Sequence, residues 1–455
     1  MPITEFLHRN RERHLEELKQ FLSIPSISAK SEHRADMARA AAWLAERMLE
    51  GGLQTAEVIE TAGHPVVLGE WRGAPGAQTL LVYGHYDVQP PEPLDEWDTP
   101  PFEPTVRDGK LFARGSVDDK GQLYLHLKAV EAHIAERGKL PVNVVFLIEG
   151  EEEIGSPHLT DFLRSNKDRL ACDAVLISDT SMFAPGQPSI GVGLRGLAYM
   201  EIRVQGGKSD LHSGSYGGAV VNPANALATI LSRLHDSDGR VAIPGFYDAV
   251  RELTAEERQS MARLPHDEEQ LRSSVGSPAL GGESGYTALE RIWARPTLDV
   301  NGLLSGYTGE GAKTVLPARA MAKVSMRLVP DQNYRDIERL FMEHVRALAP
   351  DGVTVEVEAL HGGQPWRADP TEPIFEAASR ALSQAFGKDP VFTREGGSIP
   401  IVQVFQEVFQ APVVLLGFGL PGENAHAPNE WFSLDNYQRG SEAIARLYDE
   451  LDSAV

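Results

Sequence analysis

Short apolar runs, each followed within a few residues by an acidic or imidazole side chain, are the feature that most restricts how this chain can fold. The runs span residues 80–83, 142–148 and 174–177, and the side chains that follow them are His85, the pair Glu152-Glu153, and Asp179. Between the first two runs, residues 123–134 carry apolar side chains at helical spacing. This alternation predicts an α/β domain with a mostly parallel central sheet and helices on both faces. The polar side chains should then gather at the carboxyl edge of that sheet.

The pattern changes after about residue 190. Residues 200–204 alternate between apolar and charged, as in a strand with one exposed face. From there to residue 357 the expected order is strand, helix, strand, strand, helix, strand, which is typical of ferredoxin-like domains. A polar, acidic stretch at about 251–290 indicates a helical insertion at the surface. Because 455 residues exceed what one hydrophobic core supports, we expect residues 1–190 and 363–455 to form the α/β domain, interrupted by a smaller α+β domain at 191–362.

Composition excludes several classes of partner. The formal net charge is -22, from 43 basic and 65 acidic residues, and such a surface repels nucleic acid and anionic membranes. No apolar run approaches the length of a transmembrane helix, and the first residues lack the layout of a signal peptide. The single cysteine, Cys172, allows no internal disulfide and fits a reducing compartment. We therefore expect a cytoplasmic protein.

Three glycine-rich segments resemble nucleotide-binding motifs without meeting their structural requirements. Gly191–Gly196 leads into a strand, so no helix N-terminus is available for a pyrophosphate. Gly417–Gly422 follows a strand, but Pro421 and Pro428 interrupt the helix that should open there. In Gly309–Thr314, alanine stands where glycine must precede the lysine of a phosphate loop. The sequence argues against nucleotide binding.

A set of separated acids and histidines has the composition of a two-metal site. Its members are His85, Asp118, the pair Glu152-Glu153, Asp179 and His426. Two histidines and three carboxylates can hold two dications if one carboxylate bridges them, and a further carboxylate is needed outside as general base and acid. Asp87 lies two residues from His85, close enough to orient it. Taken singly, these residues have structural alternatives: a hydrogen-bonded structural residue for a histidine after a strand, a helix cap for Asp118-Asp119, a solvated acidic loop for the glutamates, and a turn for Asp87.

The motifs around these residues resemble those of a known family. They are Gly84–Pro90, Trp97–Phe102, Arg114–Gly121, Glu151–Ser156, Ser178-Asp179, Asp210–Gly214, Met326–Pro330 and Asn424–His426, in family order over nearly the whole chain. The family is that of the zinc-dependent exopeptidases and deacylases, which includes carnosinase-type dipeptidases, glutamate carboxypeptidases, acetylornithine deacetylase and succinyl-diaminopimelate desuccinylase. The dipeptidase branch is the most similar.

The resemblance implies a role for each metal-site residue. His85 and Asp179 would bind one zinc, Glu153 and His426 the other, and Asp118 would bridge them. Glu152 would activate the attacking water and pass its proton to the leaving amine. The resemblance also implies a cis peptide bond after the bridging aspartate. Two Zn²⁺ per subunit are expected, although nitrogen and carboxylate ligands also accept Mn²⁺ or Co²⁺.

The same resemblance implies substrate contacts in the inserted domain, which would act as a lid and dimerisation domain. His212 would come from the partner subunit of a homodimer and stabilise the oxyanion. Arg327 would bind the substrate carboxylate, and Thr314 with the turn Gly396-Gly397-Ser398 would add further contacts. The structural alternatives are a polar loop residue for His212 and a surface ion pair for Arg327.

Three functions are compatible with these residues. The first is a two-metal hydrolase that cleaves the amide bond of dipeptides, with a deacylase of N-acyl amino acids as the alternative on the same site. Either substrate would carry a free carboxylate. A catalytically silent peptide-binding member of the fold would have lost a ligand, whereas all five ligands and Glu152 are present. A two-metal phosphoesterase would need basic groups facing the phosphate, and the acidic composition argues against it.

Overall fold

The computed structural model describes residues 3–397 and 399–452, and the chain divides into two compact units. The first unit contains the chain up to Val192, residues Ala368–Thr393 and the chain from Ile401 onward. The second unit contains Gly193–Arg367 together with the short segment Arg394–Pro400. That the second unit acts as a lid and dimerisation domain stays a prediction.

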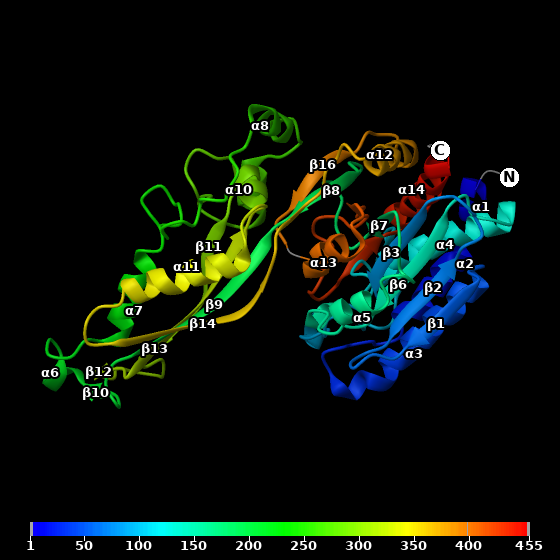
Figure 1. Ribbon diagram of the computed structural model, residues 1–455. Helices are drawn as coiled ribbons and strands as arrows, with labels where there is room; N and C mark the ends of the chain where they lie inside the picture. Colours follow the sequence, from blue (N-terminus) through cyan, green and yellow to red (C-terminus); the bar gives the residue numbers. More distant parts are fainter. Residues whose placement is uncertain (1–2, 398, 453–455) are drawn as a thin grey trace. The chain divides into compact units, whose positions relative to one another are not determined.

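The first unit is built on a mixed sheet with a parallel centre (Figure 1). Its strands lie in the order β1 (Thr55–Ile59), β2 (Val66–Trp71), β6 (Asn143–Glu149), β3 (Thr79–His85), β7 (Ala174–Ile177), β17 (Val413–Leu415) and β8 (Ser189–Leu194), with β16 (Val391–Glu395) also paired to β8. The short β15 (Trp366–Arg367) belongs to the second unit and pairs with Gly193 and Leu194 at the end of β8. Strands β6, β3, β7 and β17 are parallel neighbours. Pairing is antiparallel at both flanks, where for example β1 and β2 follow one another too closely for a crossover helix.

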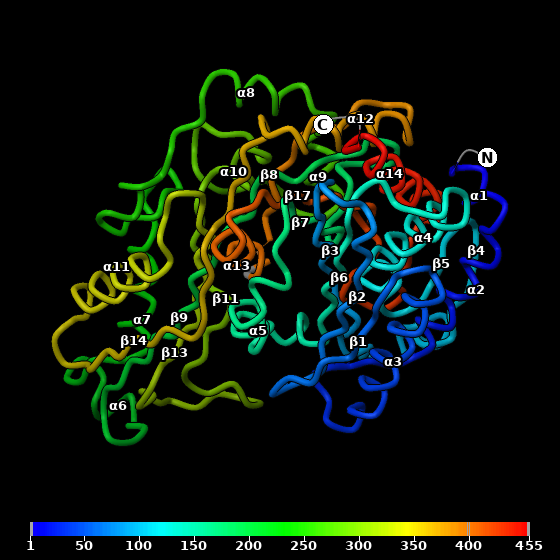
Figure 2. Tube along the Cα trace, turned by 45° about the vertical axis from the view of Figure 1, so that its right-hand side comes forward, coloured from blue at the N-terminus to red at the C-terminus, as the bar shows by residue number. Residues whose placement is uncertain are grey.

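Helices cover both faces of this sheet, as expected for the α/β class. The ring of Tyr83 in β3 packs against Phe405, with centroids 5.0 Å apart. The next residue, Gly84, faces Leu123 on the other side, because successive strand residues point to opposite faces. The helices of this unit are α1 (Ile3–Arg9), α2 (Arg11–Leu22), α3 (Arg34–Glu50), α4 (Lys120–Arg137), α5 (Leu159–Ser165), α12 (Pro373–Phe386), α13 (Pro400–Phe409) and α14 (Leu434–Asp452). The first and last helices pack together, as both views show (Figures 1 and 2).

Short irregular elements complete the first unit. Three 3₁₀ turns occupy η1 (Ser31–His33), η2 (Leu94–Glu96) and η3 (Glu152–Ile154). A small antiparallel sheet joins β4 (Thr105–Arg107), β5 (Lys110–Phe112) and β18 (Trp431–Ser433). This sheet connects the segment before α4 with the segment before α14, so residues more than 300 apart in the chain lie side by side.

Helix α4 is held at its N-terminus by a buried lysine. The Lys120 ammonium donates to the carbonyl oxygens of Phe21 and Ile24 at 3.1 and 2.7 Å. Burial lowers the pKa of Lys120 to about 7. The contacts fix the start of α4, directly after Asp118-Asp119, against the end of α2.

A second contact between α2 and α4 stabilises the protein near neutral pH and loses its effect in acid. Glu17 Oε2 accepts hydrogen bonds from Lys128 Nζ at 2.7 Å and from Tyr124 Oη at 2.8 Å. Burial alone would raise the pKa of Glu17, but Lys128, Tyr124 and Arg13 lower it from 4.5 to about 2. The unfolded chain therefore binds more protons between these values, so the stabilisation is complete above pH 4.5 and is lost as the pH falls towards 2.

We expect Glu17→Gln to lower the free energy of unfolding by about 2–3 kcal/mol at pH 7, with the difference from wild type shrinking below pH 4.5. Urea unfolding at pH 7, 4 and 3 measures this. Glu16→Gln is the matched control, because its side chain is 66% exposed and pairs with Lys19 three residues later on the same helix. A Glu17→Gln deficit that stays constant down to pH 3 would contradict the assignment.

The second unit has the predicted ferredoxin-like topology. The sheet order is β11 (Thr297–Ser305), β13 (Arg319–Leu328), β9 (Gly196–Gln205) and β14 (Thr354–Gly363), all antiparallel. Helices α7 (Pro223–Ser232) and α11 (Tyr334–Ala347) pack on one face through an apolar core that includes Ile202, Ile230 and Phe341. The predicted order of strands and helices is confirmed.

The remaining elements of this unit are short. The acidic stretch forms α8 (Ala255–Ala262), α9 (Glu268–Ser274) and α10 (Ala288–Ala294). A separate two-stranded antiparallel sheet pairs β10 (Leu211–His212) with β12 (Val315–Leu316), and α6 (Ser213–Tyr216) directly follows β10. Capping boxes at Thr254 and Thr287 explain where α8 and α10 begin. Throughout residues 3–397 and 399–452, the helices are too short or too polar to cross a bilayer.

Candidate metal centre

The carboxyl ends of the four parallel strands carry most of the predicted metal ligands. His85 is the last residue of β3, and Asp179 lies two residues after β7. Glu153 lies in η3, four residues after the end of β6, and His426 lies in the loop after β17. Asp118 comes from the loop before α4. The apolar runs therefore bring residues from five segments to one edge of the sheet, as expected from their order.

Two glycines allow these segments to approach one another. A Cβ atom at Gly84 would lie 2.7 Å from Asp119 Oδ2, and one at Gly121 would lie 1.9 Å from the carbonyl oxygen of Ser116. Glycine at these positions lets the end of β3 and the first turn of α4 close on the loop that contains Asp118. The Asp118–Asp119 peptide bond is cis, as the resemblance implied.

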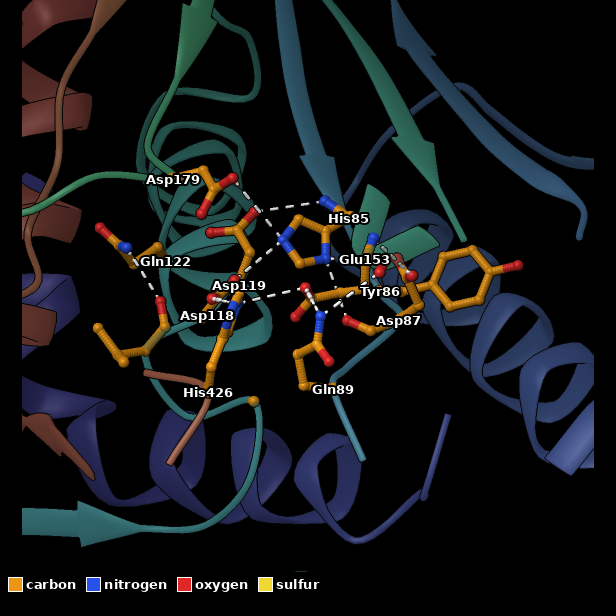
Figure 3. Close-up of polar contacts among 12 residues, drawn as sticks. His85, Tyr86, Asp87, Gln89, Asp118, Asp119, Gln122, Glu153, Asp179 and His426 are labelled. Carbon is orange, nitrogen blue, oxygen red and sulfur yellow. Dashed lines mark hydrogen bonds and ion pairs between the residues drawn. The ribbon is translucent and has the colours of Figure 1, made fainter. Parts of the chain in front are cut away.

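The first group of potential ligands consists of His85, Asp118 and Asp179 (Figure 3). His85 Nε2 lies 3.1 Å from Asp118 Oδ1 and 3.8 Å from Asp179 Oδ2. One ligand atom from each residue lies within 4.8 Å of the others, a spacing that a single cation could bridge. The His85 side chain is completely buried.

The second group consists of Asp118, Glu153 and His426, so Asp118 belongs to both. His426 Nε2 lies 2.9 Å from Asp118 Oδ2 and 3.2 Å from Glu153 Oε2. The two oxygens of Asp118 thus face different histidines, as a bridging carboxylate requires. His426 has φ +63°, a left-handed conformation that histidine adopts more readily than most residues.

Further polar side chains hold these ligands in place. His85 Nδ1 lies 3.0 Å from the carbonyl oxygen of Asp87, and Asp87 Oδ2 accepts a hydrogen bond from the Glu153 backbone at 3.1 Å. Asp87 therefore contacts one residue of each group. Gln89 Nε2 donates to Glu153 Oε2 at 2.8 Å, and Asp119 Oδ2 accepts from the His85 backbone at 3.3 Å.

Gln89 and Asp119 were not among the residues that we selected from the sequence. Gln89 lies in the motif Gly84–Pro90 and Asp119 in Arg114–Gly121, and their closeness to candidate site residues could have identified them. Gln89 is two residues beyond Asp87, and Asp119 directly follows the shared aspartate.

The electrostatics of the cluster favour a cation. Burial, followed by the Asp118 charge, raises the pKa of Asp179 well above its ordinary value. Burial also raises the pKa of Glu152 to about 7, with Glu153 and Asp118 adding to the effect. Hydrogen bonds to Asp118 and Glu153 raise the pKa of His426 to about 10. Carboxylates packed this closely oppose one another's ionisation, and divalent cations would relieve that repulsion while displacing the histidine protons. The donor set therefore fits two divalent metals.

The second unit contains four more residues predicted from the sequence, namely His212, Thr314, Arg327 and Gly397. His212 is exposed at the end of β10, and Ser213 next to it donates its backbone N–H to the Thr314 carbonyl oxygen at 3.1 Å. Arg327 lies on β13, on the sheet face opposite to Met326 and Leu328. Gly397 is exposed, and Ser398 lies outside the described residues.

Arg327 shares a cavity of about 640 Å³ with Arg195. Arg195 also holds the glycine turn, because its backbone N–H and its Nε donate to the carbonyl oxygens of Gly397 and Gly396 at 3.1 and 3.0 Å. Burial and the nearby Arg327 charge lower the pKa of Arg195 to about 10.

The lining of this cavity is positively charged within an acidic protein. Its ionisable residues other than histidine are four arginines and two acids, namely Arg195, Arg291, Arg295, Arg327, Glu283 and Asp299. Glu283 binds Arg295 through two contacts of 2.8 Å, and the arginines outnumber the acids in the lining. The cavity is suited to an anionic group.

Two groups of candidate metal ligands that share one carboxylate, at the carboxyl ends of parallel strands, are typical of the dinuclear metallohydrolases. Comparison with known proteins agrees with this class of enzyme and identifies the family. Residues 81–450 match peptidase family M20/M25/M40, and the chain belongs to that family.

The relatives are similar over nearly their whole length. The chain is 34% identical to the Cys-Gly metallodipeptidase dug1 of Schizosaccharomyces pombe, covering 99% of this chain and 98% of the relative. It is 32% identical to the human Beta-Ala-His dipeptidase, covering 99% and 92%. The crystal structure of a metallo-carboxypeptidase of the M20 family from Sulfolobus solfataricus superposes with a TM-score of 0.85 at 36% identity, covering 97% of this chain and 99% of that one.

Proposed function

We propose that the protein is a dipeptidase that holds two zinc ions and cleaves dipeptides with a free carboxylate. The observation that carries the proposal is the pair of ligand groups that share Asp118. The names of the relatives, two of which are dipeptidases, support the substrate class. His85 and Asp179 would hold one metal and Glu153 and His426 the other, with Asp118 between them.

In the proposed mechanism the chain supplies the proton transfers. Two cations bound there would polarise the scissile carbonyl and lower the pKa of the attacking water. Glu152 would accept the proton of the attacking water and donate it to the leaving amine. Burial raises the pKa of Glu152 and bound cations would lower it, so the two effects oppose one another in a group that must act as base and then as acid. Asp87 would keep His85 oriented through the contact at Nδ1.

The substrate contacts are proposed for residues of the second unit. Arg327 would bind the free carboxylate, and the excess of arginines around it supports an anionic ligand. His212 of a partner subunit would stabilise the oxyanion, which requires a homodimer, and Thr314 with the turn at Gly397 would add contacts. A cytoplasmic location is part of the same proposal, supported by the single cysteine.

We expect metal-dependent hydrolysis of unmodified dipeptides. The measurement is release of amino acids from three substrate sets: dipeptides with both ends free, the same dipeptides amidated at the carboxyl end, and N-acetyl amino acids. Each set is assayed after chelation and after addition of Zn²⁺, Mn²⁺ or Co²⁺. The free dipeptides should be cleaved, and chelation should abolish cleavage until metal is restored.

The other two sets separate the alternatives. Amidated dipeptides should be poor substrates if a carboxylate is bound. Preference for N-acetyl amino acids would show that the protein is a deacylase, with the same site, and not a dipeptidase. Absence of metal-dependent cleavage in all three sets would overturn the proposal.

A further inference from the structure

Glu430 forms a buried connection to the segment that ends in Asp118. This residue lies in the loop between β17 and β18, and its side chain is 0% exposed. Its Oε2 accepts hydrogen bonds from Arg114 Nη1 at 2.7 Å and from the Gly115 backbone at 2.9 Å. Its Oε1 accepts from the backbone N–H groups of Val117 at 2.9 Å and Asp118 at 3.2 Å. One carboxylate therefore binds four donors from five consecutive residues.

The bonding pattern is that of an ionised carboxylate, since both oxygens accept hydrogen bonds. The charge is matched by Arg114, whose side chain is 1% exposed and lies 5.5 Å from the ring of Trp97. A buried ion pair gives little net stabilisation compared with apolar side chains of the same volume. The arrangement is therefore better explained by the backbone conformation that it imposes than by its contribution to stability.

That conformation matters because both connected segments carry candidate ligands. Asp118 belongs to both ligand groups, and its own backbone N–H is one of the four donors. His426 lies four residues before Glu430 in the same loop, and its Nε2 faces Asp118 Oδ2 at 2.9 Å. A shift of the 114–118 segment relative to this loop would alter the Asp118–His426 spacing first, and then the spacing to His85.

We propose that Glu430 is a positioning residue, whose buried carboxylate holds the 114–118 segment against the His426 loop and so sets the place of Asp118 between the two metals. This inference rests on the proposed function, because that proposal assigns metals to the two groups. Glu430 itself is not a ligand. It acts through the backbone of Asp118, in the way that outer partners of metal ligands tune affinity.

The same loop offers a matched control in Glu423. This residue is also buried, at 2% exposed, and its carboxylate accepts from the backbone of Leu420 at 2.7 Å and of Ser433 at 3.1 Å. Leu420 lies within the His426 loop and Ser433 lies in β18, so neither partner belongs to the 114–118 segment. Glu423→Gln and Glu430→Gln therefore make the same chemical change in one loop and differ in which segment loses its acceptor.

The test compares Glu430→Gln, Glu423→Gln and wild type by competition with a chromophoric chelator for Zn²⁺, which gives the number of bound ions and both dissociation constants. We expect Glu430→Gln to weaken both sites by about 10–100-fold, because Asp118 serves both. Glu423→Gln should stay within about threefold at the Asp118–His85 site. Thermal unfolding of the metal-free proteins shows whether each variant folds, and a merely structural role would lower the melting temperature without changing these constants.

Wild-type affinity in a folded Glu430→Gln variant, or an equal loss in both glutamine variants, would overturn the inference. If Glu430→Gln does not fold, Glu430→Asp decides, since it keeps the charge but withdraws the carboxylate by about 1.5 Å. The same loss is expected there, and wild-type affinity would overturn the inference. Failure of the wild type to bind two ions in the same titration would instead contradict the proposed function.

Discussion

Replacing Glu152 by glutamine should lower kcat for dipeptide hydrolysis by about 10²–10⁴-fold, the usual contribution of a general base. Glutamine has nearly the same shape, but it cannot take a proton from water. Because Glu152 is adjacent to Glu153 but belongs to neither ligand group, both metals should remain bound. The measurement is kcat and KM together with metal content by atomic absorption.

The pH dependence of kcat gives a second readout for Glu152. A base must be deprotonated to act, so activity should rise with pH through the pKa of the group. Burial raises the pKa of Glu152 to about 7, while bound cations would lower it, so the acidic limb should lie at or below pH 7. Glu152→Gln should remove this limb. Glu151→Gln is the neighbouring control, since the Glu151 carboxylate contacts His158 Nδ1 at 2.8 Å and belongs to neither ligand group. A Glu152→Gln variant with wild-type kcat would remove this residue from the mechanism.

The sheet and the convergence of the candidate ligands at its edge could be predicted from the sequence because both depend on local patterns. Continuous apolar runs identify β3, β6 and β7. A polar residue directly after such a run lies at the carboxyl edge of the sheet. Arg327 shows the limit of this reasoning. Apolar residues lie on both sides of Arg327 in the sequence, so the sequence does not show which face of the sheet its side chain is on. The alternation of burial along β13 shows that it lies on the less buried face.

Glu430 could not be predicted, and the reason is physical. Three of its four donors are backbone N–H groups, which every residue except proline has, so their sequence carries no sign of the contact. The donors lie 312–316 residues away in the chain, so no periodicity links them. Interactions of this kind depend on how two loops meet, and the loops are placed by the sheet rather than by their own sequences.

The flanks of the sheet also depend on information that apolar runs do not contain. A run shows that a strand is covered on both faces, but the direction of its neighbour depends on the length and path of the connection. The parallel centre was therefore predictable, whereas the antiparallel pairing of β17 with β8 was not.

Asp118→Asn should have the largest effect on metal binding, because it is the one candidate ligand that belongs to both groups. The amide keeps the size of the side chain but has one oxygen and no charge, so it cannot serve two cations. Outer partners of a ligand alone are worth about 10–100-fold in affinity, so we expect both dissociation constants to rise by more than about 100-fold. Chelator competition with Zn²⁺ or Co²⁺ measures both constants.

Single-site replacements provide the control for this prediction. Asp179→Asn should weaken the site that contains His85, and His426→Ala the other, each leaving one ion bound. The metal-free protein gives an independent readout, since hydrogen bonds to Asp118 and Glu153 raise the pKa of His426 to about 10. NMR titration of Asp118→Asn should show this pKa fall towards 6.5. If Asp118→Asn loses only one ion, or leaves the His426 pKa unchanged, the carboxylate is not shared, and the two groups must be treated as separate sites.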